Sequence, residues 1–159
     1  MIKITLISPG KLKEKYLRDA AAEYTKRLSR FCELNIIEPD PQKLPDHPSD
    51  ALIASALKTE SEKILKKIPD SAFIIALCVE GKKLSSEQFA AKTAELCAIG
   101  KPIVFVIGSS YGLSPKVTNR ADLKLSISDM TFPHQLFRIM LLEQIYRAFQ
   151  INSGSEYHK

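Results

Sequence analysis

Apolar residues along the chain gather in short segments that predict five strands. The segments 2–7 and 33–38 are rich in β-branched and other apolar residues, as strands are. Residues 72–79 and 103–107 form unbroken apolar runs, which suit central parallel strands buried on both faces. Residues 123–127 make a fifth, shorter strand.

The spacing of apolar residues between these strands predicts helices. In 13–30 and in 50–67 the apolar positions recur three and four residues apart, so each segment can bury one side. Ser49 or Asp50 can cap the second of these helices. A loop precedes it, because four prolines exclude regular structure there. These prolines are Pro39, Pro41, Pro45 and Pro48.

Three more helices are expected in the second half of the chain. Ser85 and Gln88 fit a capping box, which opens a helix that ends near Gly100. A short helix is expected at 115–120. The last helix starts at Pro133, which suits a first turn, and it is apolar around most of its circumference. Such a helix is buried, either in the core or against a second copy of the protein.

The alternation of strands and helices predicts an α/β fold with a mainly parallel sheet and helices on both faces. Glu80-Gly81-Lys82 is expected to turn the chain after the third strand. In sheets of this kind, ligands bind where loops leave the carboxyl ends of the strands. The loops after residue 79, at 108–112 and at 127–132 follow the strongest strands, so we expect them to converge on one pocket.

The composition is that of one ordinary globular domain. The chain has 159 residues, of which 45% are hydrophobic and 26% charged, and this length can bury a core without disulfides or metals. No apolar run approaches the roughly 20 residues that cross a bilayer, and the amino terminus lacks a signal-peptide pattern, so a cytoplasmic protein is expected. The three cysteines are too far apart in sequence for a zinc site, so we expect reduced thiols and no metal.

The positive charge is concentrated at the amino terminus. Residues 1–30 contain eight Lys or Arg against three Asp or Glu, an excess of five that equals the net charge of the whole chain. Such an excess attracts phosphates of any nucleic-acid sequence, because neutralised phosphates release counterions. A solvated helix face explains the charge equally well. Lys11, Lys13 and Arg18 are the candidates for RNA contact in this region.

The loop Gly108-Ser109-Ser110-Tyr111-Gly112 follows a predicted buried strand. It lacks the G-x-G-x-x-G pattern of dinucleotide-binding loops, and no G-K-[ST] follows it to make a phosphate-binding loop. By itself, the loop is explained by a strand-to-helix turn that needs the backbone freedom of glycine.

Several further motifs occur in a fixed order before and after this loop, and together they are more specific than the loop alone. They are Val106-Ile107-Gly108, Gly112-Leu113-Ser114, the segment 128–134, a long apolar helix with Arg138, Glu143 and Tyr146-Arg147-Ala148, and the terminal Tyr157-His158-Lys159. Together with Gly10-Lys11-Leu12-Lys13 and Glu23-Tyr24, this order resembles the ribosomal RNA large subunit methyltransferase H family, the bacterial SPOUT-class pseudouridine N3-methyltransferases. That family usually carries two adjacent glycines where this chain has Gly108-Ser109.

The resemblance implies a fold and a cofactor. The fold is a SPOUT-type α/β sheet with a carboxy-terminal trefoil knot, in a single domain over 1–159 whose cofactor-binding region is about 72–159. The cofactor is S-adenosylmethionine, and the assembly is a homodimer with each cofactor pocket near the subunit boundary. The residues implied to bind the cofactor are Leu77, Gly108, Ile127, Ser128, Asp129, Met130, Thr131 and Phe132.

The implied reaction methylates N3 of a pseudouridine in bacterial 23S ribosomal RNA of the large subunit, at position 1915 in the loop of helix 69. His158, beside Tyr157 in the tail, is the candidate for contacting the base or assisting removal of the N3 proton, from its own or the opposite subunit. We interpret His134 as a helix-start residue that orients the preceding loop. His47, in the proline-rich segment, is assigned no role.

Two arginines of the last helix need compensation. Arg138 and Arg147 lie on a mostly apolar helix, where an unpaired charge is costly, so each should have a partner or a ligand. Arg138 is a candidate catalytic residue. Glu143 lies four residues before Arg147, and this ion pair or a contact with RNA explains Arg147 equally well. Lys159 is a further candidate for RNA contact.

Two other functions remain open. One is a SPOUT enzyme that acts on transfer RNA or on another ribosomal RNA site, because fold and cofactor pocket do not fix the substrate. The other is a non-catalytic RNA-binding factor of ribosome assembly that uses the basic amino-terminal region. Absence of cofactor binding would favour the second. A nucleotide-binding regulatory domain is weakened by the missing lysine of a phosphate-binding loop.

Overall fold

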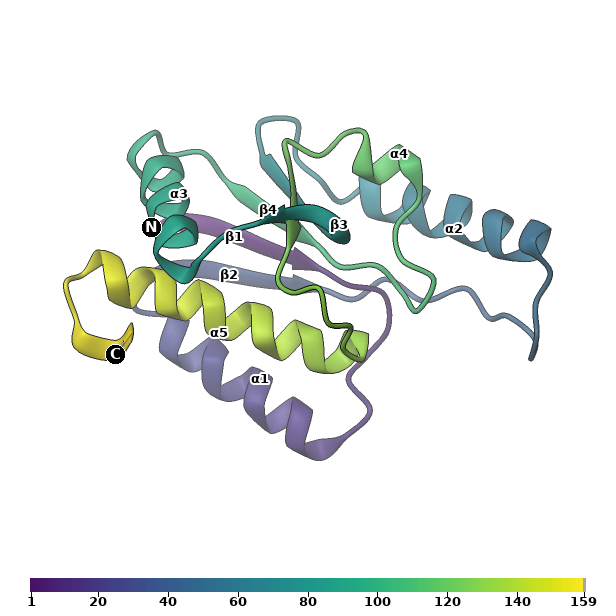
Figure 1. Cartoon of the computed structure of the whole chain (residues 1–159), viewed down its shortest axis with the longest axis horizontal. Coiled ribbons are helices and arrows are strands. Elements are labelled where there is room, and N and C mark those ends of the chain that lie inside the picture. Colours follow the sequence, from purple (N-terminus) through teal and green to yellow (C-terminus); the bar gives the residue numbers. More distant parts are fainter. Residues whose placement is uncertain (159) are drawn as a thin grey trace.

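Five parallel strands form one sheet in the order β2-β1-β4-β3-β5 (Figure 1). The computed structural model describes the backbone of residues 1–158 and the side chains of residues 1–157. The strands are β1 (Ile2–Ile7), β2 (Cys32–Ile37), β3 (Phe73–Lys83), β4 (Ile103–Val106) and β5 (Leu123–Ser126). The helices are α1 (Lys15–Leu28), α2 (Asp50–Leu65), α3 (Ser86–Ala98), α4 (Pro115–Thr118), α5 (His134–Asn152) and the single 3-10 turn η1 (Glu156–His158).

Helices cover both faces of the sheet, as predicted. α1, α3 and α5 pack on one face and α2 and α4 on the other (Figure 1). The central strand β4 shows why its sequence is continuously apolar. Ile103 and Phe105 belong to the core under α5, whereas Val104 and Val106 belong to the core under α2 and α4. Both faces of this strand are therefore buried, which confirms the interpretation of the apolar run.

Strand β3 differs from the sequence prediction. The strand is longer than predicted and continues to Lys83, but its pairing with β5 is interrupted. Leu77 and Lys82 both lie opposite Leu125, so residues 78–81 leave the regular ladder near the predicted turn. A Cβ atom at Gly81 would lie 2.7 Å from the backbone carbon of Leu125. Glycine is required here because the two backbones approach closely where the strand is irregular.

Helix α5 is buried within a single chain. It lies between α1 and α3 over the sheet (Figure 1), and Leu141, Leu142 and Ile145 are at most 1% exposed. Asn152 donates to the carbonyl of Ala90 on α3 at 2.9 Å. Burial in the core therefore explains one face of α5, whereas most of its other apolar residues are only half-buried.

Arg138 joins the start of α5 to the ends of two strands. Its side chain is 1% exposed, and its guanidinium donates to the Glu38 carboxylate at 2.6 Å, just after β2. The same guanidinium donates to Ser8 Oγ at 3.1 Å and to the carbonyl of Gly10 at 2.9 Å, just after β1. The predicted partner thus exists, and it is an internal one.

Local signals in the sequence are reproduced at several points. Ser49 caps α2 by accepting from the Leu52 amide, and Ser85 with Gln88 forms the complete capping box of α3. The proline-rich segment between β2 and α2 has no regular structure. All three cysteines are free thiols. Within the described part of the chain, no helix is both long and apolar enough to cross a membrane.

Loss of the Arg138 charge should destabilise the fold. Arg138→Met leaves Glu38 unpaired and removes the donors to Ser8 and Gly10, so we expect the free energy of unfolding in urea to fall by about 3 kcal/mol. Arg120→Met, which breaks an exposed pair with Asp70, is the matched control and should cost less than about 1 kcal/mol. Equal effects of the two substitutions would contradict this account.

Candidate active site

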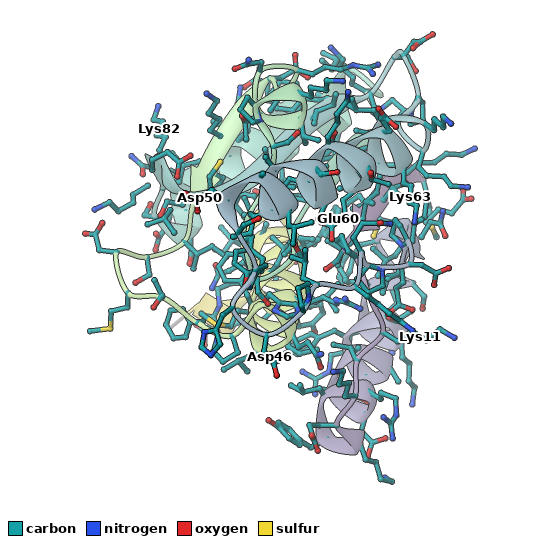
Figure 2. All side chains as sticks on the ribbon, turned by 90° about the vertical axis from the view of Figure 1, so that its right-hand side faces the viewer. Lys11, Asp46, Asp50, Glu60, Lys63 and Lys82 are labelled. Carbon is teal, nitrogen blue, oxygen red and sulfur yellow. The ribbon has the colours of Figure 1, made fainter. Side chains whose placement is uncertain are left out.

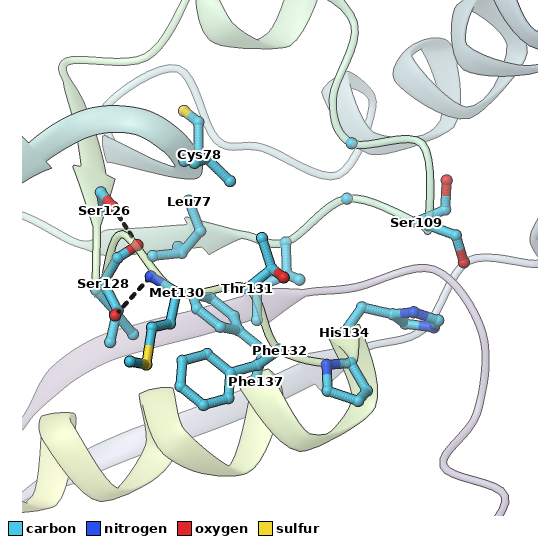
Figure 3. Close-up of a pocket in the computed structure, with 17 residues that line it drawn as sticks. Leu77, Cys78, Ser109, Ser126, Ser128, Met130, Thr131, Phe132, His134 and Phe137 are labelled. Carbon is cyan, nitrogen blue, oxygen red and sulfur yellow. Dashed lines mark hydrogen bonds between the residues drawn. The ribbon is translucent and has the colours of Figure 1, made fainter.

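The predicted convergence of three loops is confirmed. A cavity of about 380 Å³ lies where β4 and β5 end and where β3 leaves its regular pairing after Leu77, and it is lined by residues from 77–79, 107–112 and 126–134, with Phe137 (Figure 3). These segments are far apart in sequence and meet only because the three parallel strands end at the same edge of the sheet. A cavity of this size suits a small organic ligand.

Seven of the eight residues predicted to bind the cofactor line this cavity. They are Leu77, Gly108, Ile127, Ser128, Met130, Thr131 and Phe132. Asp129 does not line it, because its side chain is 79% exposed and pairs with Lys83 of β3. The backbone at residue 129 belongs to the loop, but the carboxylate is directed to solvent.

The glycine loop has a specific conformation. A Cβ atom at Gly108 would lie 2.3 Å from the carbonyl oxygen of Gly112, so any side chain at position 108 would open the loop. Gly112 itself has φ of 82°, which favours glycine, and its amide donates to the carbonyl of Ser109 at 2.8 Å. Position 109 accommodates a side chain, and the hydroxyl of Ser109 donates to the Glu60 carboxylate at 3.0 Å.

Serine hydroxyls hold the third loop. Ser126 donates to the carbonyl of Ser128 at 3.1 Å, and Ser128 Oγ accepts from the amide of Met130 at 3.0 Å (Figure 3). These two hydrogen bonds fix the shape of the loop. Leu77 and Phe132 contribute apolar surface to the same cavity.

His134 lies at the boundary between this cavity and a second one. It lines both, and Figure 3 shows its ring with Ser109 on the side away from Ser126 and Ser128. Partial burial lowers the pKa of His134, and the positive charges of Arg138 and Lys13 lower it further. A neutral imidazole at neutral pH is able to accept a proton. We interpreted this residue from sequence only as a helix start, because its position between two cavities depends on the tertiary fold.

The tail lies at the opposite end of α5 from the cavity. The Tyr157 hydroxyl donates to Glu143 at 3.1 Å, and its ring packs edge-on against Tyr146 at 5.1 Å between centroids. Burial and this hydrogen bond raise the pKa of Tyr157. The same carboxylate and burial raise the pKa of Tyr24 on α1 to about 12. Tyr157 is thus held against α5, away from the cavity that its own chain forms.

The two arginines of α5 that the sequence predicted as RNA-binding or catalytic residues are both paired within the chain. Arg147 donates to Glu143 at 2.8 Å, which is the pair expected from its spacing, and its guanidinium lies 4.9 Å from the centre of the Tyr157 ring. Arg138 does not line the cavity, and the contacts of its guanidinium explain the residue structurally, so its catalytic assignment gains no support. Lys159 and the side chain of His158 lie outside the described residues.

The basic residues before α1 are arranged around one loop. Lys11 and Lys13 are exposed and line the second cavity. Arg18 on α1 donates to the carbonyls of Leu12 and Lys13, so it fixes the shape of this segment. Two of the three predicted RNA contacts are therefore brought beside His134, and the third supports them.

Comparisons with known proteins extend over nearly the whole chain. A family model described as "Predicted SPOUT methyltransferase" matches residues 2–158. A Bifidobacterium adolescentis protein named "Ribosomal RNA large subunit methyltransferase H" is 57% identical over 159 residues, which cover 99% of this chain and 100% of that protein. A Clostridium beijerinckii protein of the same name is 52% identical with the same coverage.

A solved structure of a probable methylase family protein from Haemophilus influenzae has a similar fold. Its TM-score is 0.55 at 20% sequence identity, and the similarity covers 99% of this chain and 70% of that chain. At this identity the likeness concerns the fold alone, and it agrees with the parallel α/β sheet.

The titration of His134 tests the electrostatics of the site. Its pKa should lie below 6.5 when measured by NMR of the imidazole resonances, and Lys13→Ala should raise it by removing a positive charge. Because the folded state takes up the proton less readily than the unfolded chain, this histidine should lower stability as the pH falls below about 6.5. A pKa above 6.5, or one insensitive to Lys13→Ala, would contradict the assigned causes.

Proposed function

The chain belongs to the SPOUT methyltransferase family, and we propose that it methylates N3 of a pseudouridine in large-subunit ribosomal RNA with S-adenosylmethionine as methyl donor. The main support is the identity of 57% and 52% with proteins named ribosomal RNA large subunit methyltransferase H, over their full length. The convergence of the three loops on one cavity is the structural counterpart of this identity. The pseudouridine at position 1915 is the proposed target.

The cavity has the chemistry that an adenosyl ligand needs. Leu77, Ile107 and Phe132 provide apolar walls for a purine, and the backbone amides and carbonyls of the three loops provide polar contacts. When bound, the cofactor supplies a methyl group on a positively charged sulfonium, which is a good electrophile. The residues of this chain then have to position the base and help remove its N3 proton.

The tail is proposed to act on the RNA base across a subunit boundary. α5 has 19 residues, so its two ends are roughly 28 Å apart at 1.5 Å per residue. The cavity lies at the first end and Tyr157 follows the second. This separation favours a homodimer in which Tyr157 and His158 of one chain reach the cavity of the other, where His158 contacts the base or assists its deprotonation.

Exposed apolar side chains near the cavity support the homodimer. Met130 is 75% exposed, and Phe132 and Leu136 are each 37% exposed. Apolar residues clustered at the rim of a pocket are typical of a surface that a partner covers. A second copy placed here would close the cavity and bring its own tail to it.

The remaining parts of the proposal concern the chain as a whole. Residues 1–159 act as one domain, in which the basic region 1–30 contacts RNA and the region from about 72 holds the cofactor. Lys11, Lys13, Arg147 and Lys159 are the proposed RNA contacts, with Arg18 supporting the first two. The knot implied by the family stays a prediction. A ribosomal substrate places the activity in the cytoplasm.

Methyl transfer to large ribosomal subunits tests the function directly. We expect tritium from S-adenosylmethionine to enter 23S ribosomal RNA and to be recovered as N3-methylpseudouridine after digestion. Gly108→Ala should weaken cofactor binding in calorimetry by at least about tenfold, because its methyl group displaces the backbone of Gly112. Ser71→Ala, an exposed change outside both cavities, is the control and should leave affinity nearly unchanged.

Other outcomes would replace the proposal. Tritium in transfer RNA, or at another ribosomal position, would favour a SPOUT enzyme of different specificity. Absence of cofactor binding by the wild-type protein would favour a non-catalytic assembly factor.

Removal of the tail separates its catalytic role from a structural one. Deletion of Tyr157-His158-Lys159 should suppress methyl transfer while cofactor affinity falls little and the sedimentation coefficient still reports a dimer. His158→Ala should reproduce most of the loss in turnover, and Lys159→Ala should mainly raise the KM for ribosomes. Full activity of the truncated protein would remove the tail from the site.

A further inference from the structure

A second cavity shares a wall with the proposed cofactor pocket. It has a volume of about 250 Å³ and lies on the other side of the glycine loop, where Ser109, Ser110 and His134 line both spaces. Its other walls come from the segment before α1, the proline-rich segment and α2. Figure 2 views the molecule from this side, with α2 in front and Lys11 and Glu60 labelled.

Positive and negative side chains lie on opposite sides of this cavity. Lys11 and Lys13 stand at the side of α1, where the whole formal charge excess of the chain is found. Glu60 of α2 stands at the other side and is 5% exposed. A ligand with an anionic end and a neutral end carrying N–H donors matches this arrangement, because a phosphate is attracted to the lysines and repelled by the carboxylate.

The neutral part of the cavity suits a flat ring. Leu44, Ile53 and Leu57 supply apolar surface, and Tyr111 of the glycine loop is 47% exposed at the edge. Single-stranded RNA is commonly bound by stacking of its bases on aromatic side chains, together with basic residues along the backbone. A nucleobase on Tyr111 with its phosphate at Lys11 and Lys13 combines these two contacts.

Glu60 fixes the shape of the cavity. Its carboxylate accepts from Ser109 Oγ at 3.0 Å and from the amide of Gln42 at 3.3 Å, so α2, the proline-rich segment and the glycine loop are joined at one buried group. Lys63, one turn further along α2, donates to the carbonyl of Asp40 at 3.3 Å. These contacts hold the irregular proline-rich segment in place as a wall of the cavity.

We propose that this second cavity binds one unpaired nucleotide of the RNA substrate, with the base between Tyr111 and α2 and the phosphate at Lys11 and Lys13. The inference rests on the proposed function and deepens it by locating the RNA. Because His134 and the glycine loop separate the two cavities, a nucleotide here lies directly beside the cofactor pocket. His134 then faces the base from the shared wall.

Binding of a short fluorescein-labelled single-stranded RNA, followed by anisotropy with the full-length protein, tests the proposal. Tyr111→Ala and Lys11→Glu should each weaken binding by at least about fivefold. Ile99→Ala and Lys67→Glu are the controls, since both are exposed changes outside this cavity and outside the basic region 1–30, and should change affinity less than about twofold. The same RNA carrying 4-thiouridine should crosslink to residues 41–57 or 109–111.

The outcomes separate this proposal from the proposed function. Equal effects of cavity and control substitutions, crosslinks confined to other segments, or no binding of the RNA by the wild-type protein would each overturn the nucleotide site. Cofactor binding by calorimetry and methyl transfer to ribosomes are measured on the same variants. Retained RNA binding at the cavity without methyl transfer would support the nucleotide site and overturn the proposed reaction.

Discussion

The buried ion pair of Arg138 is the constraint on which the arrangement of the site depends. An arginine is tolerated in the core because a carboxylate after β2, a hydroxyl and a carbonyl after β1 compensate its charge. These partners tie the first turn of α5 to the carboxyl edge of the sheet. His134, which lines both cavities, lies one turn before Arg138 on the same helix. The position of the shared wall therefore follows from an arginine that lines neither cavity.

Much of this fold follows from local rules that the sequence obeys. The five strands and the helices between them were predicted because apolar periodicity, capping residues and prolines agree with the final structure. The sequence predicts that β3 ends before Gly81, whereas the strand continues to Lys83 with an irregular segment at 78–81. A glycine required by a close backbone approach looks the same in sequence as one required by a turn. Only the neighbouring strand distinguishes the two cases.

The location of the site could be predicted from the sequence because it depends on where the strands end. Three loops after parallel strands had to meet, and they do. The family resemblance predicted the individual cofactor-binding residues. It could not show that the side chain of Asp129 points to solvent, because a sequence motif does not tell which side chains of a loop face the cavity. His134 and Glu60 were not identified as cavity residues because their neighbours come from distant segments. The clustering of Glu143 with Tyr24 and Tyr157 likewise depends on how α1 packs against α5.

The glycine loop separates the two cavities, so a change in its conformation affects both of them. Ser109 and Ser110 face both spaces, and Ser109 is linked to α2 through Glu60. Any ligand that favours one conformation of this partition changes the affinity of the opposite space, and linkage requires the effect to be reciprocal. Ligands bound on its two sides would be coupled through this one short segment without touching each other, to the extent that each favours a particular conformation of it.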